Sequence, residues 1–95
     1  MFTWINKQGV RSDNGFVVQR TSRFGAEYQE GDAVISLYVE SGVQGGLPCI
    51  IIDPSAFKRW DDGRAIAPEK QRHILQNFTE AMTFQDLKTV VEKGE

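Results

Sequence analysis

Cysteine, histidine and long apolar runs are scarce in this sequence, and each scarcity excludes a class of protein. The single cysteine, Cys49, cannot form an internal disulfide, whereas secreted domains of this size usually carry several. The longest uninterrupted apolar stretch is Cys49–Ile52, far short of the roughly 20 residues that span a membrane. The first residues show no basic stretch followed by a long apolar run, so we expect no signal peptide. The sequence therefore predicts a cytoplasmic protein without membrane contact.

Motifs that carry catalysis or bind metals are also missing. His73 has Glu69 and Asn77 four residues away on either side, so no nucleophile accompanies it. There is no Cys-x-x-Cys pair, His-Glu-x-x-His motif or calcium-loop spacing, and no Lys-Ser or Lys-Thr follows the glycines of 42–46. Adjacent carboxylates at Asp61 and Asp62 are more typical of a solvated turn than of a magnesium site. We expect no catalytic residue, no metal and no cofactor, and hence a protein that is not an enzyme.

The overall composition is that of a small globular domain. Of the 95 residues, 40% are hydrophobic, 25% charged and 11% aromatic, which is too apolar for a disordered chain. Domains typically contain about 100–150 residues, so we expect one domain covering residues 1–95. A chain this short buries only about 60–65% of its unfolded surface and therefore has a thin core.

The charges are distributed unevenly, although the formal net charge is only −2. Residues 1–24 carry +3, residues 25–62 carry −5, and the remainder is balanced. An acidic middle favours a basic partner and argues against nucleic-acid binding. The alternative is an ordinary solvated polar face.

Alternation and turn residues predict the strands. In 33–40, Ile35, Leu37 and Val39 share one face, and Ser36, Tyr38 and Glu40 share the other. The residues between this strand and 26–29 are Glu30-Gly31-Asp32, which is typical of a hairpin turn. Gly42, Gly45 and Gly46 predict a flexible loop over 41–48. The expected strands are 2–6, 16–21, 26–29, 33–40 and a well-covered strand at 49–53.

The residues that follow predict a helix. Pro68 suits a first helical turn, and a single apolar stripe runs from Ile74 to Met82. We expect this amphipathic helix over 68–83 and a last strand within 86–92, with a short helix over 86–92 as the alternative. The predicted fold class is α+β: a curved antiparallel β-sheet of four to six strands with one amphipathic C-terminal helix packed on one face.

The segment 56–63 combines large aromatic and charged side chains between a strand and the helix. Phe57 and Trp60 accompany Lys58 and Arg59 and the acids of Asp61-Asp62. Trp and Arg together are typical of binding hot spots. The alternative is that the aromatic rings close the core beneath the helix. The two acids offset the attraction of the two basic residues for nucleic-acid phosphates, so we expect no nucleic acid as partner.

The order of motifs resembles immunity protein family 74 of bacterial polymorphic toxin systems. The motifs are Tyr28-Gln29-Glu30-Gly31, a strand ending in Val39-Glu40, an isoleucine-rich strand, Trp60-Asp61, and a helix with Arg72, Ile74, Asn77 and Ala81. The resemblance covers roughly residues 24–92; Asp62-Gly63 stands where the family has a proline after Trp-Asp. It implies a bacterial protein that neutralises a cognate toxin domain by direct binding, without catalysis.

Charge and resemblance together define the candidate partner-binding residues. They are Glu27, Glu30, Asp32, Glu40, Arg59, Trp60, Asp61 and Asp62. Two alternatives stay open. One is a self-associating regulatory or structural module, such as a homodimer through an exposed sheet edge. The other is a small-ligand-binding domain in which Trp4, Tyr38 and Trp60 line a pocket.

Overall fold

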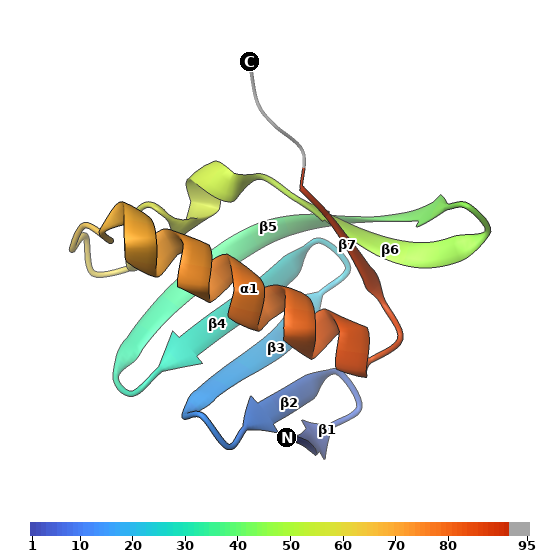
Figure 1. The fold of residues 1–95 in the computed structure, drawn as a ribbon, viewed down its shortest axis with the longest axis horizontal. Helices are drawn as coiled ribbons and strands as arrows, with labels where there is room; N and C mark the ends of the chain where they lie inside the picture. The colour runs from blue at the N-terminus through green and yellow to red at the C-terminus, as the bar shows by residue number, and fades with distance from the viewer. Residues whose placement is uncertain (92–95) are drawn as a thin grey trace.

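The computed structural model describes residues 1–91 as one curled β-sheet with a helix laid across it (Figure 1). The strands follow one another in the sheet in the order β1-β2-β3-β4-β5-β6-β7. The elements are β1 (Phe2–Asn6), β2 (Gly9–Ser12), β3 (Phe16–Ser22), β4 (Gly25–Glu30), β5 (Ala33–Gln44), β6 (Leu47–Ile52), the short 3-10 helix η1 (Pro54–Phe57), α1 (Pro68–Phe84) and β7 (Lys88–Val91). The predicted α+β class with a C-terminal helix is confirmed.

The sheet has seven strands, so the predicted count of four to six was wrong. The unpredicted strand is β2, a four-residue strand that includes Arg11 and Ser12. It carries too few apolar residues to show an alternation, and its place comes from pairing with β1 and β3 on its two sides. Within residues 1–91, β7 is the one strand that pairs in parallel, with β6, because α1 supplies the long crossover that a parallel neighbour requires.

The predicted loop over 41–48 was also wrong, because this segment forms a hairpin. β5 continues to Gln44, β6 begins at Leu47, and the two strands pair along this whole length. Gly45 and Gly46 form the turn with φ of 60° and 81°, a backbone that glycine adopts without steric cost. Glycines that suggested flexibility therefore make a tight two-residue turn.

β5 joins the two halves of the curled sheet. Residues 33–38 of β5 pair with β4, and residues 39–44 pair with β6. Figure 1 shows β5 as one long arc from the lower left to the upper right, with the other strands curling around α1 as a half-barrel. The curvature gives the sheet a concave inner face and a convex outer face.

The core lies between the inner face and α1. Ile35, Leu37 and Val39 of β5 are 1, 4 and 1% exposed, as the alternation predicted. The helix begins at Pro68, as expected, and ends one residue after the predicted boundary. Its buried residues are Ile74, Asn77, Phe78, Ala81 and Met82.

The last predicted strand is present as β7. Its predicted range, 86–92, includes Glu92, which lies outside the described residues. Asp86 precedes β7 with a φ of 62°, and the chain turns there from the end of α1 into the strand.

In the part of the chain that the structure describes, α1 is neither long nor apolar enough to cross a membrane.

Candidate partner-binding surface

The outer face of the sheet carries the candidate surface, because no element within residues 1–91 is laid across it as α1 is across the inner face (Figure 1). Ser36, Tyr38 and Glu40 of β5 point outward and are exposed. On β4, Glu27 faces outward too, since it pairs directly with Ser36. The alternation predicted in the sequence therefore places polar and aromatic side chains of two neighbouring strands on one open face.

An exposed aromatic stack lies on this face. The rings of Phe24 and Tyr38 are stacked, with centroids 6.1 Å apart and planes 15° apart. The guanidinium carbon of Arg23 lies 5.4 Å from the centroid of the Phe24 ring. Phe24 and Tyr38 remain 48% and 65% exposed, so the core does not account for them. Large exposed aromatic side chains next to an arginine are typical of binding hot spots.

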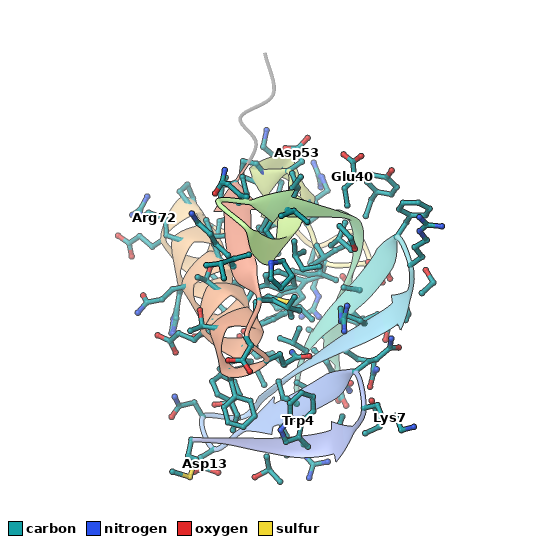
Figure 2. The ribbon with its side chains drawn as sticks, turned by 90° about the vertical axis from the view of Figure 1, so that its right-hand side faces the viewer. Trp4, Lys7, Asp13, Glu40, Asp53 and Arg72 are labelled. Carbon is teal, nitrogen blue, oxygen red and sulfur yellow. The ribbon has the colours of Figure 1, made fainter. Side chains whose placement is uncertain are left out.

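A small cavity lies beside Tyr38. Its volume is about 170 Å³, and it is lined by Tyr38, Glu40, Ile51, Ile52 and Asp53. Glu40 pairs across the sheet with Ile51, and Asp53 follows β6 directly. Figure 2 shows Glu40 and Asp53 close to the same end of the molecule, well away from Trp4.

The carboxylate of Asp53 is held in its ionised form. Its Oδ1 accepts a hydrogen bond of 2.9 Å from the backbone N–H of Ser55 and so caps η1. This bond, together with the Ser55 hydroxyl and the nearby Lys58, lowers the pKa of Asp53 below its ordinary value. A negative charge is therefore fixed at the end of β6.

Asp61 adds a further carboxylate and closes an open strand edge. Its carboxylate accepts hydrogen bonds from the backbone N–H of Ser36 at 2.9 Å and from the Ser36 hydroxyl at 2.6 Å. Its own N–H donates to the carbonyl of Val34 at 2.8 Å. These bonds fall on the part of β5 that β6 does not reach. We define the acidic–aromatic stripe as Phe24, Glu27, Tyr38, Glu40, Asp53 and Asp61.

Glu30 belongs to a different environment from the stripe. Its carboxylate accepts a hydrogen bond from Lys70 Nζ at 2.6 Å and another from the hydroxyl of Tyr28. Asn77 Nδ2 donates to the same hydroxyl at 3.0 Å, and Tyr28 is fully buried. Burial alone would raise the pKa of Glu30, but the hydrogen bonds from Lys70 and Tyr28 outweigh it and lower the pKa. Burial raises the pKa of Tyr28, and Glu30 raises it further.

This network opens on a cavity of about 460 Å³. The cavity is lined by Asn14, Gly15, Phe16, Glu30, Gly31, Lys70, His73 and Asn77. Lys70 and Glu30 form an ion pair of 2.6 Å at its wall. The network links α1 to β4, and its polar groups hydrogen-bond mainly to one another.

The segment 56–63 is bonded mostly within itself and to the core. Arg59 Nη1 donates to the carbonyl of Gly63 at 3.1 Å, and Arg64 Nε donates to Asp62 at 2.7 Å. Trp60 is half-buried, and its ring stacks on Tyr28 with centroids 6.5 Å apart. Phe57 is 1% exposed. The arrangement agrees with the alternative in which the aromatic rings of this segment close the core.

The eight candidate residues from the sequence are therefore divided by the structure. Glu27, Glu40 and Asp61 lie together on the outer face. Glu30 bridges to α1, while Arg59, Trp60 and Asp62 bond or pack within their own region. Asp32 lies exposed in the turn between β4 and β5.

Sequence reasoning missed Arg23, Phe24 and Asp53. The alternation in β5 already placed Tyr38 on the solvent face, and that position was the available signal for an aromatic binding element. Phe24 gave no such signal, because it precedes β4 and meets Tyr38 only through strand pairing.

The structure does not bring together the three side chains proposed to line one ligand pocket. Each of Trp4, Tyr38 and Trp60 packs against a different aromatic ring. Trp4 packs on Phe84 at 5.7 Å, while Tyr38 stacks on Phe24 and Trp60 on Tyr28. Within residues 1–91, no group of three or more His, Cys, Asp or Glu side chains is placed to hold a metal ion.

In comparisons with known proteins, no family model matches the chain, and no match was found among curated proteins or solved structures.

Proposed function

We propose that this chain is a non-catalytic binding protein whose acidic–aromatic stripe docks a basic protein partner. The observation that carries the proposal is the exposed Phe24–Tyr38 stack accompanied by the four carboxylates of the stripe. Aromatic rings supply apolar contact area at low entropic cost, and the carboxylates attract a partner of opposite charge. The negative field of the same surface would repel phosphate groups, which argues against nucleic acid as the partner.

The more specific form of the proposal is an immunity protein that neutralises a cognate bacterial toxin domain. It rests on the sequence resemblance described above, together with a surface suited to a basic domain such as a nuclease. Neutralisation would occur by occupying the toxin's active site or an essential surface, so the chain itself needs no cofactor. This form of the proposal places the protein in the cytoplasm, where the toxin acts.

Affinity capture with matched charge variants tests the binding proposal. The tagged chain is compared with Glu27→Lys/Glu40→Lys, which reverses two charges of the stripe. The control, Glu69→Lys/Glu80→Lys, makes the same change of net charge on exposed positions of α1. We expect one stoichiometric partner from host lysate that the control retains, that the stripe variant loses, and that rising salt releases. Equal retention by both variants would contradict a role for the stripe.

The immunity proposal is tested separately on the captured partner. The partner's domains are expressed in a bacterial host with and without this chain, and growth is measured. We expect growth arrest without the chain and growth with it, and weaker rescue by Glu27→Lys/Glu40→Lys. A partner that binds through the stripe but does not arrest growth would refute immunity while leaving the binding proposal in place.

A second candidate function, self-association, is favoured by the edge of the sheet at β1. β1 is the first strand of the sheet and has a neighbour on one side only within the described chain. Trp4, Ile5 and Phe84 near this edge are 49, 38 and 39% exposed, and an open edge with apolar side chains can pair with another copy. Sedimentation at several concentrations discriminates the two. A mass that rises with concentration and is restored to the monomer by Ile5→Lys would favour this alternative.

A further inference from the structure

The cavity beside Tyr38 is too small for an ordinary ligand. Pockets for drug-sized molecules have volumes of about 300–1,000 Å³, whereas this cavity has about 170 Å³. The volume is of the order of one long side chain. The question is therefore which side chain its lining would accept.

The floor of the cavity has an apolar side chain at Ile51, which pairs with Glu40 and therefore faces outward with it. Ile52 also borders the cavity, but it is only 2% exposed and its side chain belongs to the core. Long basic side chains bury their methylene stems along such surfaces while keeping the charged end near polar groups. A floor of this kind suits the stem of lysine or arginine.

Two carboxylates stand at the rim. Glu40 comes from β5 and Asp53 from the start of η1, so they belong to different elements and border the same space. The charge of Lys58, at the end of η1, helps to lower the pKa of Asp53. Among residues 1–91, neither Glu40 nor Asp53 has a lysine or arginine nitrogen within 4.0 Å. Both charges are therefore available to a cation from outside.

The aromatic wall is suited to the same cation. Tyr38 lines the cavity and stacks on Phe24, and the Phe24 ring already holds the Arg23 guanidinium at 5.4 Å. The ring that stacks on Tyr38 thus already accepts one guanidinium. Cations within about 6 Å of such rings are attracted by the ring quadrupole.

We infer that the cavity formed by Tyr38, Glu40, Ile51, Ile52 and Asp53 receives a single lysine or arginine side chain of the protein partner. The inference rests on the proposed function and names the element of the partner that the stripe recognises. The stem of the side chain lies on Ile51, and its charged end lies between the tyrosine ring and the two carboxylates. The remaining acids of the stripe, Glu27 and Asp61, lie outside the cavity and steer the partner's approach.

Fragment binding to the intact chain tests the cavity without the partner. Ethylguanidinium and n-butylammonium serve as probes of the arginine and lysine side chains, and 1-butanol serves as the uncharged control. Amide chemical shifts are followed by ¹H–¹⁵N NMR at millimolar probe concentrations. We expect saturable shifts centred on Tyr38, Glu40 and Ile51–Asp53 with at least one cation, and weaker shifts with the alcohol. Whichever cation binds more tightly identifies the side chain.

The variants isolate the charge and the ring. Glu40→Gln/Asp53→Asn removes both charges but keeps the cap of η1, because asparagine caps as well as aspartate. Tyr38→Leu removes the ring, and Tyr38→Phe keeps it as the matched control. We expect about tenfold weaker cation binding in the charge variant and in Tyr38→Leu, since about 1.4 kcal/mol corresponds to tenfold, and unchanged binding in Tyr38→Phe.

The outcomes separate the cavity from the wider proposal. Absence of localised, saturable shifts with both cations would overturn the inference, as would equal shifts with 1-butanol. If the captured partner is then still lost with Glu27→Lys/Glu40→Lys, the binding function stands and only the side-chain site fails. If the cations bind and the partner does not depend on the stripe, the binding proposal fails instead.

Discussion

Asp61 and Glu30 are carboxylates of similar type within the acidic middle of the sequence, but each has specific partners inside the molecule. Asp61 bonds to Ser36, and Glu30 bonds to Lys70 and Tyr28. Both pairs join segments that are far apart in sequence, by 25 and 40 residues for the Ser36 and Lys70 contacts. At the scale of the residue, negative charge on this protein is used partly for internal structure and partly for the outer surface.

Replacing Asp61 by alanine should destabilise the fold. The change removes both hydrogen bonds that the Asp61 carboxylate accepts from Ser36, so that the backbone bond to Val34 alone holds the loop to this edge of β5. We expect a loss of about 1.5–3 kcal/mol in the free energy of unfolding, as for hydrogen bonds to a charged group, measured by urea denaturation. Asp62→Ala in the same loop serves as the control and should cost less, since Asp62 bonds only to the neighbouring Arg64. Equal losses for the two variants would contradict the edge-closing role.

Glu30 should make stability depend on pH. Its pKa in the folded state is lowered from the ordinary 4.5, so its stabilising effect is complete above that value and is lost as the pH falls through the lower folded-state value. We expect the difference in unfolding free energy between the native chain and Glu30→Gln to shrink below about pH 4.5. Urea denaturation at a series of pH values measures it.

The partner residue provides the control for Glu30. Lys70→Met removes the ammonium group that holds the carboxylate ionised, and in the Glu30→Gln background it should change the pH dependence little. Stability curves of the native chain and Glu30→Gln that stay parallel through the acid range would refute the assignment.

The roles of single residues could be predicted only in part. The outward position of Tyr38 followed from strict alternation with Ile35, Leu37 and Val39, whose apolar side chains fix the inner face. The role of Asp61 could not be predicted, because Ser36 comes beside it only through the path of the loop after η1. The position of Trp60 could not be predicted either. The composition of segment 56–63 suggested a surface hot spot, but in the fold the Trp60 ring stacks on Tyr28.

At the scale of the element, the helix was the most predictable part and β2 the least. The apolar stripe of α1 and its proline start are local signals, and the observed helix extends one residue past the expected end. β2 depends on strands to either side, which a local pattern does not contain. The hairpin at Gly45-Gly46 was missed because glycine serves both flexible loops and tight turns, and pairing between 39–44 and 47–52 decides between the two.

The start of α1 can be improved, because Ala67 is an N-cap residue without a capping side chain. Its φ of −61° and ψ of 148° are those of an N-cap, and no side-chain hydrogen bond is formed there. Ala67→Ser should stabilise the protein by about 0.5–1.5 kcal/mol by accepting a bond from a free N–H of the first turn. Thermal and urea unfolding measure the gain. Ala65→Ser, also exposed and before the helix, should have little effect; a gain as large there would argue against capping.

At the scale of the whole molecule, the two tryptophans report on different parts of one core. Trp4 packs on Phe84 at the end of α1, and Trp60 stacks on Tyr28 beneath its middle. If residues 1–95 form one cooperative domain, Trp4→Phe and Trp60→Phe should each unfold in a single transition whose fluorescence and far-UV circular dichroism midpoints coincide. Separate fluorescence and circular dichroism midpoints within either variant would show that the β1 side of the sheet unfolds on its own.

The order of strands also determines how this chain assembles as it is synthesised. Each strand from β2 to β6 pairs with the strand that precedes it in the sequence. The sheet can therefore form strand by strand from local contacts while the nascent chain leaves the ribosome. Its concave side then carries Phe16, Val18 and Ile35 in contact with water until α1 arrives. Folding of segment 68–91 is therefore the step that covers the core. A truncated chain that lacks this segment would expose the apolar concave face of the sheet and aggregate.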